Sequence, residues 1–77
     1  MTKNYIQQMT ELADSKFYDV EEFKQVSSHP EDTHLIIVRL SGWNHVVYLY
    51  NGLDNAFYSG SYHFEEEFAK EAFKRKK

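Results

Sequence analysis

HLIIVRL-SGWN-HVVYLY, residues 34–50, contains two runs of β-forming residues on either side of a short turn segment. Gly42-Trp43 fits the glycine-first pattern of a two-residue type II′ turn, so the runs are expected to form an antiparallel hairpin. Side chains alternate along each strand, which places six residues on one face as the pairs Leu40–His45, Val38–Val47 and Ile36–Leu49. The other face is expected to carry the pairs Leu35–Tyr50, Ile37–Tyr48 and Arg39–Val46.

The length and composition of the chain limit the kinds of protein that it can be. A chain of 77 residues forms one small compact domain, residues 1–77. It has no cysteine, which excludes disulfides and thiolate metal sites and suits a reducing compartment. The longest unbroken apolar run, residues 35–38, is too short to cross a bilayer. We therefore expect a cytoplasmic (intracellular) protein that does not associate with membranes.

Helical periodicity appears at both ends of the chain. Thr2 to Ala13 predicts an amphipathic helix, with Asn4 as N-cap and an apolar stripe of Ile6, Met9, Ala13 and Phe17. Tyr62 to Arg75 predicts a second helix, in which acidic residues occupy the first turn and basic residues the last. Its expected inward stripe consists of Phe64, Phe68 and Ala72, with Ala69 and Phe73 beside it.

The segments beside the hairpin complete the expected sheet. Residues 19–26 fit either a short helix or an edge strand, and the short loop at residues 28–32 favours the strand. A further strand follows a five-residue loop and aligns Phe57 with Leu49 and Tyr58 with Tyr48. The sequence thus predicts an α+β two-layer sandwich: a helix, a meander of three or four antiparallel strands, and a helix. Both helices are expected on one sheet face, which leaves the other face open.

Residue patterns typical of catalysis or cofactor binding are weak in this chain. No serine lies in a nucleophile-elbow setting, and the carboxylates form no expected inward-facing pair. The three glycines lie in separate turns, so no phosphate-binding loop is expected. The histidines, His29, His34, His45 and His63, lack the close spacing of metal ligands. We therefore expect a protein that is not an enzyme and holds no metal or cofactor.

Charge and aromatic content point instead to a binding role. Four of the nine Lys and Arg residues lie at positions 74–77, which leaves five of them against twelve Asp and Glu. An acidic body favours a partner protein with a basic surface over nucleic acid. The open sheet face and the Trp43 turn supply aromatic residues of the kind enriched at interfaces, and the same face allows a homodimer. The predicted partner-binding residues are Arg39, Trp43, Tyr48, Tyr50, Tyr58, Glu65, Glu66 and Glu67.

The small, acidic, cysteine-free architecture is similar to that of phage-encoded inhibitors, including some anti-CRISPR proteins. The resemblance implies a phage-type anti-defence inhibitor that occupies a basic site, such as a nucleic-acid-binding site, on a larger protein, with carboxylates in place of phosphates. The carboxylates that would serve in this way are Glu21, Glu22, Glu31, Asp32 and Glu65 to Glu67.

Nucleic-acid binding is the alternative function. Tyr48, Tyr50 and Tyr58 beside Arg39 resemble the aromatic platforms on which single-stranded bases stack, so the alternative is a single-stranded nucleic-acid-binding module. The helix–strands–helix order also resembles the double-stranded RNA-binding domain. Those domains carry lysines at the start of the last helix, where this chain has Glu65 to Glu67, which would repel a phosphate backbone.

Overall fold

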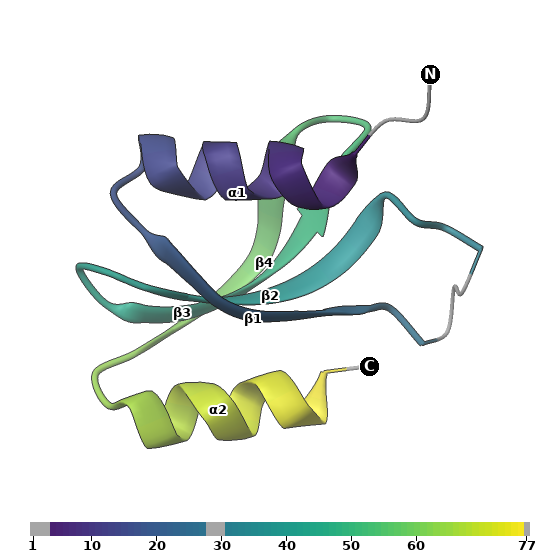
Figure 1. Cartoon of the computed structure of the whole chain (residues 1–77). Helices are drawn as coiled ribbons and strands as arrows, with labels where there is room; N and C mark the ends of the chain where they lie inside the picture. Colours follow the sequence, from purple (N-terminus) through teal and green to yellow (C-terminus); the bar gives the residue numbers. More distant parts are fainter. Residues whose placement is uncertain (1–3, 28–30, 77) are drawn as a thin grey trace.

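The computed structural model describes residues 4–27 and 31–76, and it confirms the α+β meander (Figure 1). Four antiparallel strands pair in sequence order between two helices. The elements are α1 (Tyr5–Ser15), β1 (Asp19–Gln25), β2 (Leu35–Ser41), β3 (His45–Asn51), β4 (Ala56–His63) and α2 (Glu66–Arg75). The strand interpretation of residues 19–26 is thereby confirmed. Ser28, His29 and Pro30 of the expected loop lie outside the described residues.

Both helices differ from their predicted spans. Asn4 is the N-cap of α1, as expected, and its Oδ1 accepts the Gln7 N–H at 3.0 Å. The helix therefore begins at Tyr5 instead of Thr2, and it continues two residues beyond Ala13 to Ser15. The second helix begins at Glu66 because β4 extends to His63, so the predicted helical start at Tyr62 is wrong.

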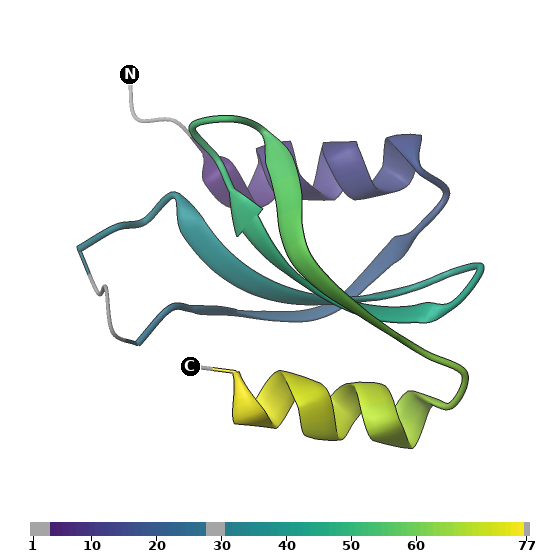
Figure 2. The same ribbon diagram turned by 180° about the vertical axis from the view of Figure 1, so that it is seen from behind.

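The two helices lie on opposite faces of the sheet, so the predicted placement of both on one face is wrong (Figures 1 and 2). On one side, Met9 and Ala13 of α1 pack against alternate residues of β2. On the other side, Ala69 and Phe73 of α2 pack against Ile37 and its neighbours. The reason lies in β2, in which all five residues from Ile36 to Leu40 are buried. A strand that is apolar on both faces requires cover on both faces.

The pairing of β2 with β3 differs by one residue from the predicted register. The connection is a three-residue loop, residues 42–44, instead of a two-residue turn. Leu40 consequently pairs with Val46, Val38 with Tyr48 and Ile36 with Tyr50. Because side chains alternate, this single step moves Tyr48 and Tyr50 to the face that α1 covers.

The pairing of β3 with β4 is also shifted by one residue. Residues 52–55 form a four-residue loop, so Leu49 pairs with Tyr58, and Tyr50 pairs with Phe57. An irregularity between Val47 and Leu49 then changes the register toward the end of β4.

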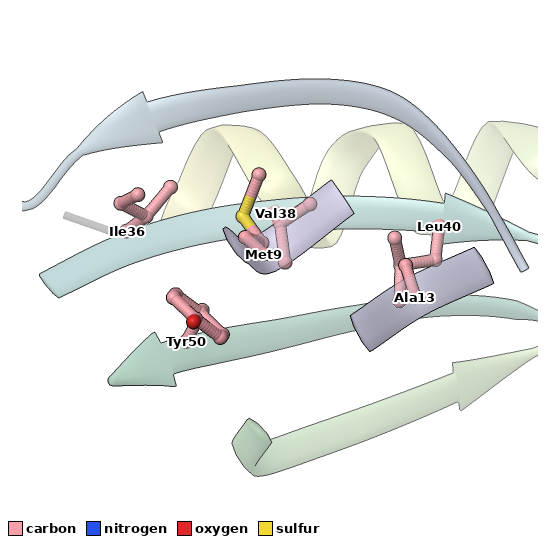
Figure 3. Close-up of a cluster of buried hydrophobic side chains, with 6 residues drawn as sticks. All are labelled: Met9, Ala13, Ile36, Val38, Leu40 and Tyr50. Atoms are coloured by element: carbon pink, nitrogen blue, oxygen red, sulfur yellow. The ribbon is translucent and has the colours of Figure 1, made fainter. Parts of the chain in front are cut away.

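The principal core lies between α1 and the sheet (Figure 3). Val38 is fully buried there. Tyr50 is the largest fully buried side chain of the described residues. The buried members of this cluster are Met9, Ala13, Ile36, Val38, Leu40 and Tyr50.

Candidate functional site

The predicted aromatic platform on an open sheet face is not formed. Arg39 is only 4% exposed and Tyr50 is fully buried, so the prediction that both lie on an open surface is wrong. Tyr48 is half-buried on the α1 side, whereas Tyr58 pairs with Leu49 on the α2 side. The register change thus separates the residues that the sequence pattern had placed together.

Arg39 has a structural position beneath α2. Its Nε and Nη2 donate to Oε2 of Glu22 in β1, at 3.1 and 2.8 Å. Its Nη1 lies 3.6 Å from Oε1 of Glu66 in the first turn of α2. A buried guanidinium requires such partners, because an unpaired charge in this position would be costly. Arg39 therefore connects β1, β2 and the start of α2.

The tyrosines Tyr48 and Tyr50 are held by neighbouring side chains. The Tyr50 hydroxyl accepts from Gln8 Nε2 at 2.8 Å and donates to Asn55 Oδ1 at 2.7 Å. The Tyr48 ring stacks on Phe57 with centroids 4.9 Å apart, and its hydroxyl lies 2.6 Å from the Tyr62 hydroxyl. Burial, followed by this hydrogen bond, raises the pKa of Tyr48 above its ordinary value of 10.0. Burial likewise raises the pKa of Tyr50.

The most exposed aromatic side chains gather at one end of the sheet. Trp43 is 79% exposed, Phe17 is 78% exposed and Phe64 is 96% exposed. Trp43 lies in the β2–β3 loop, Phe17 in the α1–β1 link and Phe64 in the β4–α2 link. These three connections lie at the same end of the molecule, on the left in Figure 1 and on the right in Figure 2. We call these three residues the aromatic end.

Phe17 and Trp43 come from connections that touch. A Cβ atom added at Gly42 would lie 2.6 Å from the Phe17 carbonyl oxygen, so only glycine permits this close approach. The Gly42 N–H also bonds to the Asn44 carbonyl at 3.1 Å and closes the loop. The backbones that carry Phe17 and Trp43 therefore support each other.

Carboxylates surround the aromatic end. Glu65, Glu66 and Glu67 directly follow Phe64 and are exposed at the N-terminus of α2, where the helix dipole favours negative charge. Asp19 and Glu21 are exposed in the first half of β1, which begins at the same end. Lys16 lies beside Phe17, and Lys70 forms an ion pair with Glu66 at 3.5 Å. Negative charge thus predominates around the three aromatic side chains.

Sequence reasoning identified only part of this surface. Trp43 and Glu65 to Glu67 were predicted as contact residues, and all four are exposed at this end. Phe17 and Phe64 were instead assigned to inward helical stripes, which is wrong. Phe17 lies beyond the end of α1, and Phe64 precedes the start of α2. Phe68, also predicted to face inward, is 55% exposed.

No protein-family model, curated protein or solved structure matches this chain.

Within residues 4–27 and 31–76, no three or more His, Cys, Asp or Glu side chains are grouped so that they could hold a metal ion. His45 and His63 are cross-strand neighbours in β3 and β4, a pairing that their sequence spacing did not reveal. His29 lies outside the described residues. In the described part of the chain, neither helix is long and apolar enough to cross a membrane.

Proposed function

We propose that this chain is a non-enzymatic protein-binding module that uses the aromatic end to bind a partner with a basic surface. One observation supports this most strongly: three large aromatic side chains, each at least 78% exposed, lie at the same end of a small domain. Exposed apolar groups of this size are unfavourable in water unless a partner covers them. Aromatic residues also dominate the binding energy of many protein interfaces.

The surrounding carboxylates support a basic partner. Negative groups beside the aromatic side chains accelerate encounter with a positive surface and disfavour acidic partners. The finer proposal is an inhibitor of the phage type, in which Glu65 and Glu67 occupy positions that nucleic-acid phosphates would take on the partner. Such an inhibitor competes with nucleic acid for its target.

The alternative as a nucleic-acid binder has less support. Its aromatic platform required Tyr48, Tyr50 and Tyr58 on one open face together with Arg39, and two of these four residues are buried. The carboxylates beside the aromatic end would repel a phosphate backbone.

The first experiment compares capture of host proteins by four forms of the immobilised chain, with and without nuclease. These are the wild type, Trp43→Ala, the double variant Glu65→Lys/Glu67→Lys, and Leu53→Ala. Leu53 is the matched control, because it is 64% exposed but lies in the β3–β4 loop at the other end of the sheet. Glu66 is left intact because its carboxylate lies close to Arg39 and Lys70.

We expect the wild type and Leu53→Ala to retain the same host protein, which has a basic surface. Trp43→Ala should weaken its binding about tenfold or more, and the double variant should weaken it most at low salt. Equal retention by Trp43→Ala and wild type would contradict the proposal, as would loss of all binding after nuclease treatment. Competition between the chain and a nucleic acid bound by that protein tests the inhibitor proposal.

A further inference from the structure

Phe17 occupies a backbone position that normally belongs to glycine. Helix α1 ends in a Schellman motif: the Phe17 N–H bonds to the Asp14 carbonyl and the Tyr18 N–H bonds to the Ala13 carbonyl, both at 3.0 Å. Phe17 is the left-handed residue of this motif, with a φ angle of 64°. Glycine is the usual residue here because a side chain in this conformation crowds the following carbonyl.

Phenylalanine is poorly suited to this conformation. The other described non-glycine residues with positive φ are Asn55 and Ser59, at 51° and 54°. Their short polar side chains can form local hydrogen bonds that offset part of the strain. A phenyl ring has no such group. Its burial does not offset the strain either, because Phe17 is 78% exposed.

The strained backbone is nevertheless firmly held. The two hydrogen bonds of the Schellman motif fix Phe17 from the helix side, and Gly42 packs against its carbonyl oxygen from the β2–β3 loop. A conformation determined from two sides positions the attached ring rigidly, which reduces the entropy lost when a partner covers it.

We infer that Phe17 is an anchor residue for the partner, held by the fold in a strained conformation that presents its ring at the aromatic end. This inference rests on the proposed function and identifies a contact residue within the aromatic end. It explains why a large aromatic residue stands where glycine would stabilise the isolated domain. Local rules are broken most often at functional positions.

The first test measures stability without any partner. Phe17→Gly should raise Tm by about 4 °C, because it removes the left-handed strain and loses little packing. Phe17→Ala keeps a Cβ in the strained conformation and should leave Tm nearly unchanged. Ser59→Gly, in the middle of β4, is the matched control for strain relief away from the aromatic end. A fall in Tm for Phe17→Gly would show that the ring stabilises the fold and would overturn the inference.

The second test measures contact, with photoreactive benzoyl-phenylalanine placed at position 17, 43 or 53 and the protein irradiated in host lysate. The inference expects crosslinks from positions 17 and 43 to the same protein, and none from position 53. Phe17→Gly and Phe17→Ala should each weaken retention of that protein about tenfold or more. A crosslink from position 43 without one from position 17 would overturn the role of Phe17 and leave the proposed function standing. The absence of specific crosslinks from both positions would overturn both.

Discussion

The two faces of the sheet are covered by helices of similar length but are stabilised in different ways. On the α1 face, the large side chains of Tyr50, Met9 and Leu40 are fully buried against one another. On the α2 face, the helix contributes one large side chain, Phe73, together with Ala69 and Ala72. That face also contains the buried cation Arg39, paired with Glu22 and close to Glu66.

This difference indicates that the α1 face supplies most of the hydrophobic stabilisation, while the α2 face depends more on charge. Stabilisation by burial grows with the apolar area removed from water, and large side chains dominate that area. The charges that fix α2 are partly exposed on the carboxylate side, where Glu22 and Glu66 side chains are 41% and 52% accessible. We therefore expect salt to weaken the attachment of α2 more than that of α1.

The largest expected effect comes from truncating one buried valine to alanine on each face of the sheet. Val38 and Val47 are fully buried on adjacent central strands, one toward α1 and one toward α2. Val38→Ala should cost about 2–3 kcal/mol of unfolding free energy, because its large neighbours cannot close the cavity. Val47→Ala should cost only about 1–2 kcal/mol, because a cavity costs less where a neighbouring element moves to fill it, and we expect α2 to do so. Urea unfolding measures both values, and an equal or larger cost for Val47→Ala would remove the proposed asymmetry.

A smaller effect is expected from adding one methyl group on the α1 side. A Cβ atom at position 60 would lie 2.3 Å from the Tyr48 ring, which is already stacked on Phe57. Gly60→Ala should therefore cost about 1–2 kcal/mol through overpacking. In a Tyr48→Ala background the same change should be neutral or stabilising, since the obstructing ring is gone. Unfolding of the four proteins in this cycle tests the contact, and equal effects in both backgrounds would contradict it.

Replacing Arg39, which pairs with Glu22 beneath α2, by lysine should lower the free energy of unfolding by about 1 kcal/mol. Arg39→Lys keeps the charge and most of the stem but cannot reproduce the two N–H groups that bind Glu22. This cost should shrink in about 1 M salt, because the carboxylates are accessible to solvent. Tyr50→Phe is the matched control on the α1 face, because the hydrogen bonds that it loses join neutral groups. The unfolding free energy lost in this variant should therefore not change with salt. A salt-independent cost for Arg39→Lys would show that packing of the stem dominates.

The sequence was sufficient for the order and type of the elements but not for their register. Alternating and helical apolar patterns identified both helices and three strands, because burial imposes these periods. Residues 19–26 fitted either a short helix or a strand, and only the short loop that follows favoured the strand. The turn chemistry of Gly42-Trp43 did not distinguish a two-residue from a three-residue loop. This difference of one residue in loop length determines which side chains of β3 lie on the same sheet face as Val38. The unbroken apolar run in residues 35–38 did carry the signal for a sheet covered on both sides.

The candidate site was predictable only where exposure followed from local sequence. Trp43 in a turn and Glu65 to Glu67 at a helix start are exposed because of their local positions. Phe17 and Phe64 required knowledge of the helix ends. Ser15 and Lys16 give no stop signal, and α1 ends without the glycine that usually marks a Schellman motif. Likewise, the extension of β4 to His63 excluded Phe64 from the helical stripe.

The smallest expected effect is a loss of stability at alkaline pH, which we expect from a tyrosine on the α1 face but not from one on the α2 face. Burial raises the pKa of Tyr48 above 10.0 in the folded protein, so the unfolded chain releases this proton first as pH rises. The contribution of Tyr48 to stability is therefore complete below about pH 10 and is lost above it, by up to about 1 kcal/mol near pH 11.

Tyr48→Phe should flatten the fall in unfolding free energy between about pH 9 and about pH 11, because phenylalanine has no proton to release. Tyr58 is the control on the α2 side. Its hydrogen bond to Asp54 also raises its pKa, but the group is exposed to solvent, which screens the interaction. Tyr58→Phe should leave the slope almost unchanged. Urea unfolding across this pH range compares the three proteins. If Tyr58→Phe flattened the curve as much as Tyr48→Phe, burial on the α1 face would not be the source of the alkaline sensitivity.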